Sequence, residues 1–109
     1  MNMVVKIWRW LSLTLGQARR YRTVRVSELP GSIKKHRLYL VGDDDAYWFA
    51  ALLCPCGCGS SIQLPLVGRR PRWKVNMHKN GYCSLTPSVW RTTGCKSHFF
   101  LVQGKVRWA

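Results

Sequence analysis

The sequence predicts a mostly β fold, a small antiparallel sheet built of hairpins, preceded by a short N-terminal extension that is helical or extended. Runs that alternate polar and apolar residues recur from Tyr21 onward. Turn signals rich in glycine, proline and asparagine separate these runs. Cysteine and histidine side chains stand in two tight groups, which is typical of a metal clip in a small domain.

Length and composition indicate a single small domain. We divide the 109 residues into an amphipathic extension, residues 1–20, and a β domain, residues 21–109. The chain has 18 Lys and Arg against 4 Asp and Glu, a net charge of +14 that attracts polyanions. Its 6 Trp, 4 Tyr and 3 Phe favour a compact β module over disorder.

The cysteine count argues against a disulfide framework. Five cysteines leave one unpaired, and bridges among the alternate positions of Cys54–Cys58 would be strained. We therefore predict reduced thiols in a cytoplasmic protein.

The first seventeen residues leave three interpretations open. Their apolar residues follow the spacing of one helical face, with Lys6 and Arg9 between them. The segment could pack on the core of the domain, dock on a partner protein through Trp8 and Trp10, or lie on an anionic membrane surface. It is too short and too charged to span a bilayer, and we do not expect a membrane partner.

The β domain begins with four expected strands. Three consecutive aspartates after Gly42 are interpreted as a solvated turn, and the run from Ala46 to Leu53 as a strand buried on both faces. That strand leads directly to Cys54, so the cysteine group is the tip of a hairpin. The expected strands are Tyr21–Val26, Arg37–Val41, Ala46–Leu53 and Ser61–Leu66.

The second half of the chain carries a basic segment followed by more hairpins. Residues 73–78 and 81–85 are expected to pair around Asn80-Gly81, and residues 99–102 with 105–108. The basic segment could bind a phosphate backbone and stack a base, or it could be a solvated loop with its tryptophan turned into the core. Its residues are Arg69, Arg70, Arg72, Trp73 and Lys74.

Five side chains are candidate metal ligands. Cys54, Cys56 and Cys58 stand in a C-x-C-x-C group whose glycines allow a sharp bend, and Cys95 and His98 follow in a C-x2-H group. Zn²⁺ accepts thiolate and imidazole in a tetrahedral site, so we predict Zn²⁺ as the cofactor. Two or three ligands from the first group plus both of the second is the preferred set. Cys83, in a strand, is expected to be a buried thiol.

The same residues resemble a bacterial family of small Cys/His zinc-binding proteins, a domain of unknown function. The resemblance covers residues 28–109 and follows the signature CxCGCG…PS(I/V)…CxSH, here Cys54–Gly59, Pro87-Ser88-Val89 and Cys95–His98. Members are often encoded beside ubiquitin-like modifiers and their E1-, E2- and JAB-type partners. The resemblance implies a zinc-binding β module of a ubiquitin-like conjugation system in antiviral defence, with a component of that system as its protein partner.

No catalytic residue is predicted. A catalytic zinc wants a carboxylate base nearby, and the few acidic residues are Glu28 and the aspartates at 43–45. Because His98 is assigned to the metal, no Ser-His or Cys-His pair is indicated. We therefore predict a non-enzymatic interaction module that docks on a conjugation component. A nucleic-acid-binding zinc module is the alternative, and a metallohydrolase is a minor third hypothesis.

Overall fold

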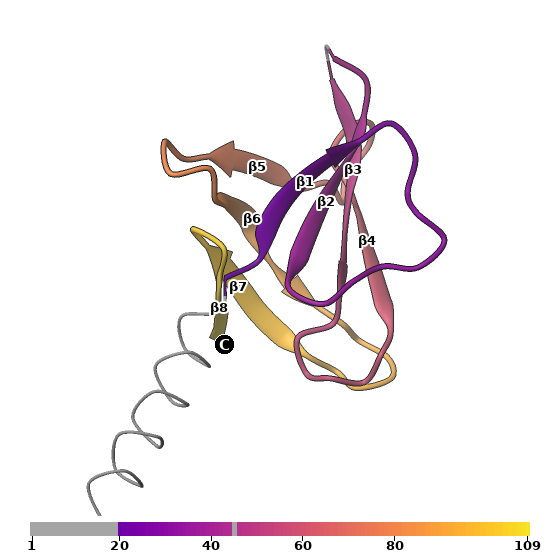
Figure 1. Cartoon of the computed structure of the whole chain (residues 1–109). Helices are drawn as coiled ribbons and strands as arrows, with labels where there is room; N and C mark the ends of the chain where they lie inside the picture. Colours follow the sequence, from indigo (N-terminus) through magenta and orange to yellow (C-terminus); the bar gives the residue numbers. More distant parts are fainter. Residues whose placement is uncertain (1–19, 45) are drawn as a thin grey trace, which may run out of the picture.

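Two four-stranded β-sheets make up the described part of the protein (Figure 1). The computed structural model describes residues 20–44 and 46–109, and the prediction of a mostly β fold is confirmed within them. Trp8 and Trp10 lie outside the described residues, so the extension and its docking role stay predictions. The first sheet has the order β1 (Arg22–Val26), β2 (Arg37–Gly42), β3 (Tyr47–Leu53), β4 (Ser61–Pro65), and the second β5 (Lys74–Met77), β6 (Cys83–Trp90), β7 (His98–Val102), β8 (Lys105–Trp108).

The first sheet contains one parallel pair among strands that were expected to be antiparallel. β1 runs parallel to β2, whereas every other neighbouring pair is antiparallel. A parallel pair requires a crossover connection, and residues 27–36 provide it. Leu29 and Ile33 of this connection pack on the outer face of the first sheet.

The core lies between the two sheets, whose inner faces pack on each other. Side chains alternate along each strand, so that every second residue of β2, β3, β4, β6 and β7 enters one shared cluster. The largest fully buried side chains are Phe99, Leu38, Leu40, Leu52, Leu101 and Cys83. The prediction that Cys83 is a buried thiol is confirmed.

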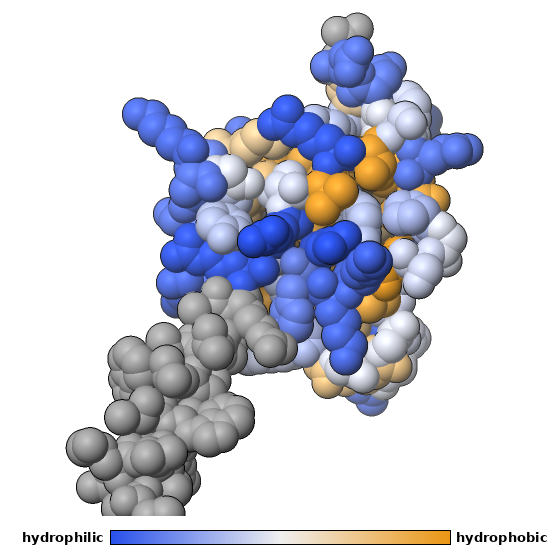
Figure 2. Space-filling model, viewed as in Figure 1, coloured by the Kyte–Doolittle hydropathy of each residue, from blue (hydrophilic) through white to orange (hydrophobic). Residues whose placement is uncertain are grey.

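A second, smaller cluster explains the continuous apolar run in β3. Tyr39, Val41 and Ala51 point to the opposite face, where the crossover covers them. β3 is therefore buried on both faces at Ala50–Leu52, while Trp48 nearer its start is exposed. Hydrophilic side chains dominate the face of the molecule seen in Figure 2, with a strip of apolar side chains between them.

β6 carries an irregularity that matters for the site. Leu85 pairs with Leu101 and Val89 with Phe99, so residues 86–88 face the single residue Phe100. Such a bulge bends the strand and changes the direction of its side chains. Leu85 and Val89 on either side of the bulge both point into the core, so Ser88, next to Val89, lies on the outer face of the second sheet, beside β7.

Among the residues that the structure describes, there is no helix with the length and hydrophobicity of a membrane span.

Gly104 connects the start of β1 to the second sheet. Its carbonyl accepts a hydrogen bond from Tyr21 N at 2.7 Å, and its N–H donates to Cys83 O at 2.8 Å. Its φ is +77°, and a Cβ there would lie 2.8 Å from Tyr82 Cδ1 and 3.0 Å from Tyr21 O. Backbone conformation and close packing therefore both require glycine.

Gly104→Ala should destabilise the domain by about 2 kcal/mol or more, because a left-handed conformation is unfavourable for alanine and its methyl group has no space. Urea unfolding followed by tryptophan fluorescence measures the change. Gly31→Ala is the control: nothing lies within 4 Å of its Cβ position and its φ is not in the left-handed region, so its midpoint should stay close to that of the unmodified chain. Equal unfolding midpoints for the two variants would contradict the assignment.

Candidate metal centre and serine–histidine pair

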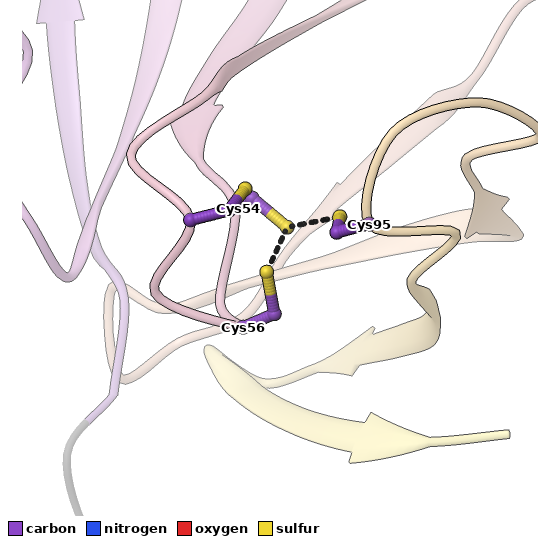
Figure 3. Close-up of side chains that lie close together, drawn as sticks. Cys54, Cys56 and Cys95 are labelled. Carbon is purple, nitrogen blue, oxygen red and sulfur yellow. Dashed lines mark hydrogen bonds between the residues drawn. The ribbon is translucent and has the colours of Figure 1, made fainter.

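Four thiols meet where a loop of each sheet approaches the other. Residues 54–60 connect β3 to β4, and residues 91–97 connect β6 to β7. The Sγ atoms of Cys54, Cys56, Cys58 and Cys95 all lie within 4.8 Å of one another. Figure 3 shows Cys54 between Cys56 at 3.3 Å and Cys95 at 3.5 Å. The structure thus brings together four of the five predicted ligands.

The first loop has a local reason for presenting its sulfurs to one point. Cys54 N donates to Ser60 O at 2.8 Å, and Gly57 N donates to Cys54 O at 3.2 Å, which closes the loop into a tight bend. Gly57 and Gly59 have φ values of +89° and +82°. Only glycine adopts these readily, so the C-x-C-G-C-G sequence encodes the bend.

The donor set fits a soft or borderline divalent metal. A tetrahedral ion with bonds of about 2.3 Å to sulfur separates its ligands by about 3.8 Å, close to the distances seen here. All four cysteines are free thiols. Arg91 Nη1 lies 3.3 Å from Cys95 Sγ and 3.6 Å from Cys58 Sγ, so its guanidinium offsets the negative charge that four thiolates bring.

The pKa values of these thiols diverge, as expected for a crowded group. Hydrogen bonds to the Ser97 side chain and backbone lower the pKa of Cys95 to about 6. Ser60 lowers that of Cys58 to about 7. Hydrogen bonds to Cys54 and Cys58 raise that of Cys56 to about 11. Adjacent thiols resist ionising together, and a bound cation removes that conflict.

His98, the fifth predicted ligand, lies on another face of the structure. Its Nε2 is 2.9 Å from Ser88 Oγ. Side chains alternate at the start of β7: Ser97 points inward, 3.3 Å from Cys54 Sγ and 3.1 Å from Cys95 Sγ, and His98 points outward. The C-x2-H segment therefore does not close into one turn around the sulfurs. Trp90 stacks on the His98 ring at 5.1 Å and 15°.

A second serine–histidine contact lies on the same sheet. His78 Nε2 is 2.7 Å from Ser84 Oγ. Ser84 Oγ also accepts a hydrogen bond from Gln103 N at 2.8 Å. Ser84 Oγ is therefore hydrogen-bonded to the backbone of the β7–β8 turn. Ser88, by contrast, lies in the bulge of β6.

A groove adjoins Ser88. It has a volume of about 820 Å³ and is lined by residues 70–74 together with Thr86 and Pro87. We call it the basic groove, since Arg70, Arg72 and Lys74 border it. Trp73 packs against the core, and its Nε1 donates to Ser88 O at 3.4 Å. Arg69 does not line the groove.

Ser88 is the residue that the sequence interpretation missed. Its signal was present in the signature PS(I/V)…CxSH, which places a serine and a histidine on two strands that pair. Because His98 was assigned to the metal, the sequence interpretation had no histidine to pair with Ser88.

Together these features define a small two-sheet β protein with four clustered thiols that can hold a metal ion and, on another face, a serine–histidine pair. The chain matches the family model described as bacterial ubiquitination-like system serine protease (BubE) over residues 25–109. The chain belongs to this family.

The family overturns one prediction. Its description names a serine protease, which contradicts the expectation that the protein is not an enzyme. The error has a physical origin: the sequence did not indicate the Ser88–His98 contact, because it depends on which face of β7 carries His98. The association with a bacterial ubiquitin-like system is confirmed.

Curated proteins with similar segments belong to another class. The chain is 37% identical over 71 residues to the sulfite reductase [NADPH] hemoprotein beta-component of Alteromonas mediterranea, and 34% identical over 71 residues to that of Aliivibrio salmonicida. Each match covers 63% of this chain, which spans only 12% of the length of either relative. No solved structure matches the chain.

Metal content should depend on the four clustered thiols and not on the histidine. Cys95→Ser and Cys58→Ser should each lower the bound metal per chain, because a hydroxyl replaces a thiolate ligand. Cys83→Ser, a buried thiol outside the cluster, is the matched control, and His98→Ala should retain the metal. Elemental analysis after gel filtration measures this. Metal lost in His98→Ala but kept in Cys58→Ser would contradict the four-thiol centre.

Arg91→Ala should release the metal at a higher pH than the unmodified chain does. Because the pKa of Cys95 is lowered to about 6 and that of Cys58 to about 7, protons compete with the metal for their sulfurs increasingly as the pH falls through this range. Removing the guanidinium takes away a positive charge 3.3 Å from Cys95 Sγ and 3.6 Å from Cys58 Sγ, which makes protonation of both thiolates easier and strengthens this competition. Metal retained after dialysis over a pH series gives the midpoint, and Arg91→Lys should lie between the two. Identical midpoints would refute the role of Arg91.

Proposed function

We propose that this protein is a serine hydrolase of a bacterial ubiquitin-like system, with Ser88 as nucleophile and His98 as general base. The observation that carries the proposal is the 2.9 Å contact between Ser88 Oγ and His98 Nε2 on the outer face of the second sheet. This distance allows direct proton transfer. Membership of a family described as a serine protease supports the reaction class.

The chemistry requires the histidine tautomer that carries its proton on Nδ1. Nε2 then takes the proton of Ser88 as Oγ attacks the substrate carbonyl, and returns it to the leaving group as the acyl bond to Ser88 remains. Water then attacks this acyl group, and His98 accepts a proton from the water. His98 returns that proton to Ser88 Oγ as the ester bond breaks, which releases the carboxylic acid product and restores the hydroxyl. Stacking of Trp90 on the ring holds its plane in place.

The metal in this proposal is zinc, held by Cys54, Cys56, Cys58 and Cys95. It closes the loop 91–97, which joins the strand of Ser88 to the strand of His98. Arg91 N donates to Ser97 O at 2.8 Å across the base of that loop. A structural metal contributes folding free energy on the order of 10 kcal/mol, so the metal fixes the strand ends from which the pair projects. A role in antiviral defence is part of the proposal and rests on the resemblance alone.

Ser88→Ala should abolish labelling by a fluorophosphonate probe, which reacts covalently with activated serines. His98→Ala should lower the labelling rate by about three orders of magnitude, because the hydroxyl loses its base. In-gel fluorescence over time measures the rate, and mass spectrometry of the labelled peptide identifies the serine.

The second serine–histidine contact supplies the matched control. Ser84→Ala and His78→Ala should leave labelling close to that of the unmodified chain. Labelling that survives in Ser88→Ala and disappears in Ser84→Ala would transfer the reaction to the other pair. No labelling of the metal-loaded chain would overturn the proposal altogether.

A further inference from the structure

We infer that the basic groove is a substrate subsite for an acidic peptide segment next to the bond that Ser88 attacks. The inference rests on the proposed function, whose substrate it narrows. Its first support is position: Thr86 and Pro87, which line the groove, immediately precede Ser88 in the bulge of β6. The groove therefore ends at the residue before Ser88, and a peptide bound in it lies close to Ser88.

The shape of the groove suits a peptide. Its volume of about 820 Å³ falls in the usual range of ligand pockets and holds several residues. Pro71, Pro87 and the half-buried Trp73 give it apolar surface. The Trp73–Ser88 hydrogen bond joins this surface to the backbone of the nucleophile. A segment bound here is therefore held in a fixed place relative to Ser88.

Charge selects which peptide fits. Arg70, Arg72 and Lys74 border the groove, and its lining contains no acidic residue. Arg72 Nη1 donates to Gly68 O at 3.0 Å, so part of that guanidinium is used within the loop. Arg70 and Lys74 are exposed, so their charged groups can bind carboxylates. Asp and Glu side chains of a substrate supply those carboxylates.

The structure favours a peptide over a nucleic acid. Base stacking needs a well-exposed aromatic face, whereas Trp73 is only half exposed, because it packs on the core and donates its Nε1 proton to Ser88 O. The groove also leads to a nucleophile suited to acyl transfer. The experiment therefore also tests the predicted nucleic-acid binding, for which the sequence suggested Arg69, Arg70, Arg72, Trp73 and Lys74.

Fluorescence anisotropy of labelled ligands tests the inference on the metal-loaded full chain. The probes are an Asp/Glu-rich decapeptide, its Asn/Gln twin, and a single-stranded oligonucleotide of the same charge. Arg70→Glu with Lys74→Glu reverses two cations of the groove. Arg69→Glu with Lys79→Glu makes the same charge change at exposed sites outside it, and an unfolding curve for each variant confirms that it is folded.

The acidic peptide should bind on the order of tenfold more tightly than its twin, as two or three exposed charge pairs allow. The groove variant should lose this preference and the control variant should keep it. Bound acidic peptide should also slow fluorophosphonate labelling of Ser88. Equal losses in both double variants would assign the preference to net charge and overturn the inference, as would equal binding of the two peptides or groove-dependent binding of the oligonucleotide alone.

Labelling separates this inference from the proposed function. Ser88 labelling without an acidic preference refutes the subsite and leaves the hydrolase standing. Groove-dependent binding of the acidic peptide to a chain that never reacts with the probe refutes the hydrolase and leaves the binding site.

Discussion

The gathering of four thiols between the two sheets is the constraint on which the site depends. Cys54, Cys56 and Cys58 come from the first sheet and Cys95 from the second. Ser97 lies between them, within 3.3 Å of Cys54 Sγ, and His98 follows it in sequence. A metal ion bound by the sulfurs would therefore also hold His98, the first residue of β7, in place. Because a small domain has little stability to spare, a metal at this junction would support the sheets and the site at once.

The two halves of the site use opposite faces of the same strands. Inward side chains of β6 and β7 build the core, and their outward side chains place Ser88 against His98. A site on paired strands is held more precisely than one on a mobile loop. Within the irregular stretch of β6, Pro87 lines the groove and Ser88, the next residue, contacts His98.

Part of the excess of basic residues is gathered at the basic groove. A net charge of +14 by itself indicates attraction to any polyanion. The basic groove concentrates part of that charge next to Ser88, and under the proposed function electrostatic attraction would orient an acidic substrate as well as attract it. Arg91 has a separate task, because its guanidinium faces the sulfurs of Cys58 and Cys95.

The sequence alone determined the features that depend on neighbouring residues. Alternation identified the strands, and glycines at 57 and 59 identified the bend that presents Cys54, Cys56 and Cys58. Tertiary structure decided the parallel pairing of β1 with β2, the division into two sheets and the partner of His98. These depend on register, and a shift of one residue moves a side chain to the opposite face of a sheet. The local pattern around residues 95–98 does not reveal that Ser97 points to the sulfurs and His98 outward to Ser88, because that depends on which face of β7 each residue occupies.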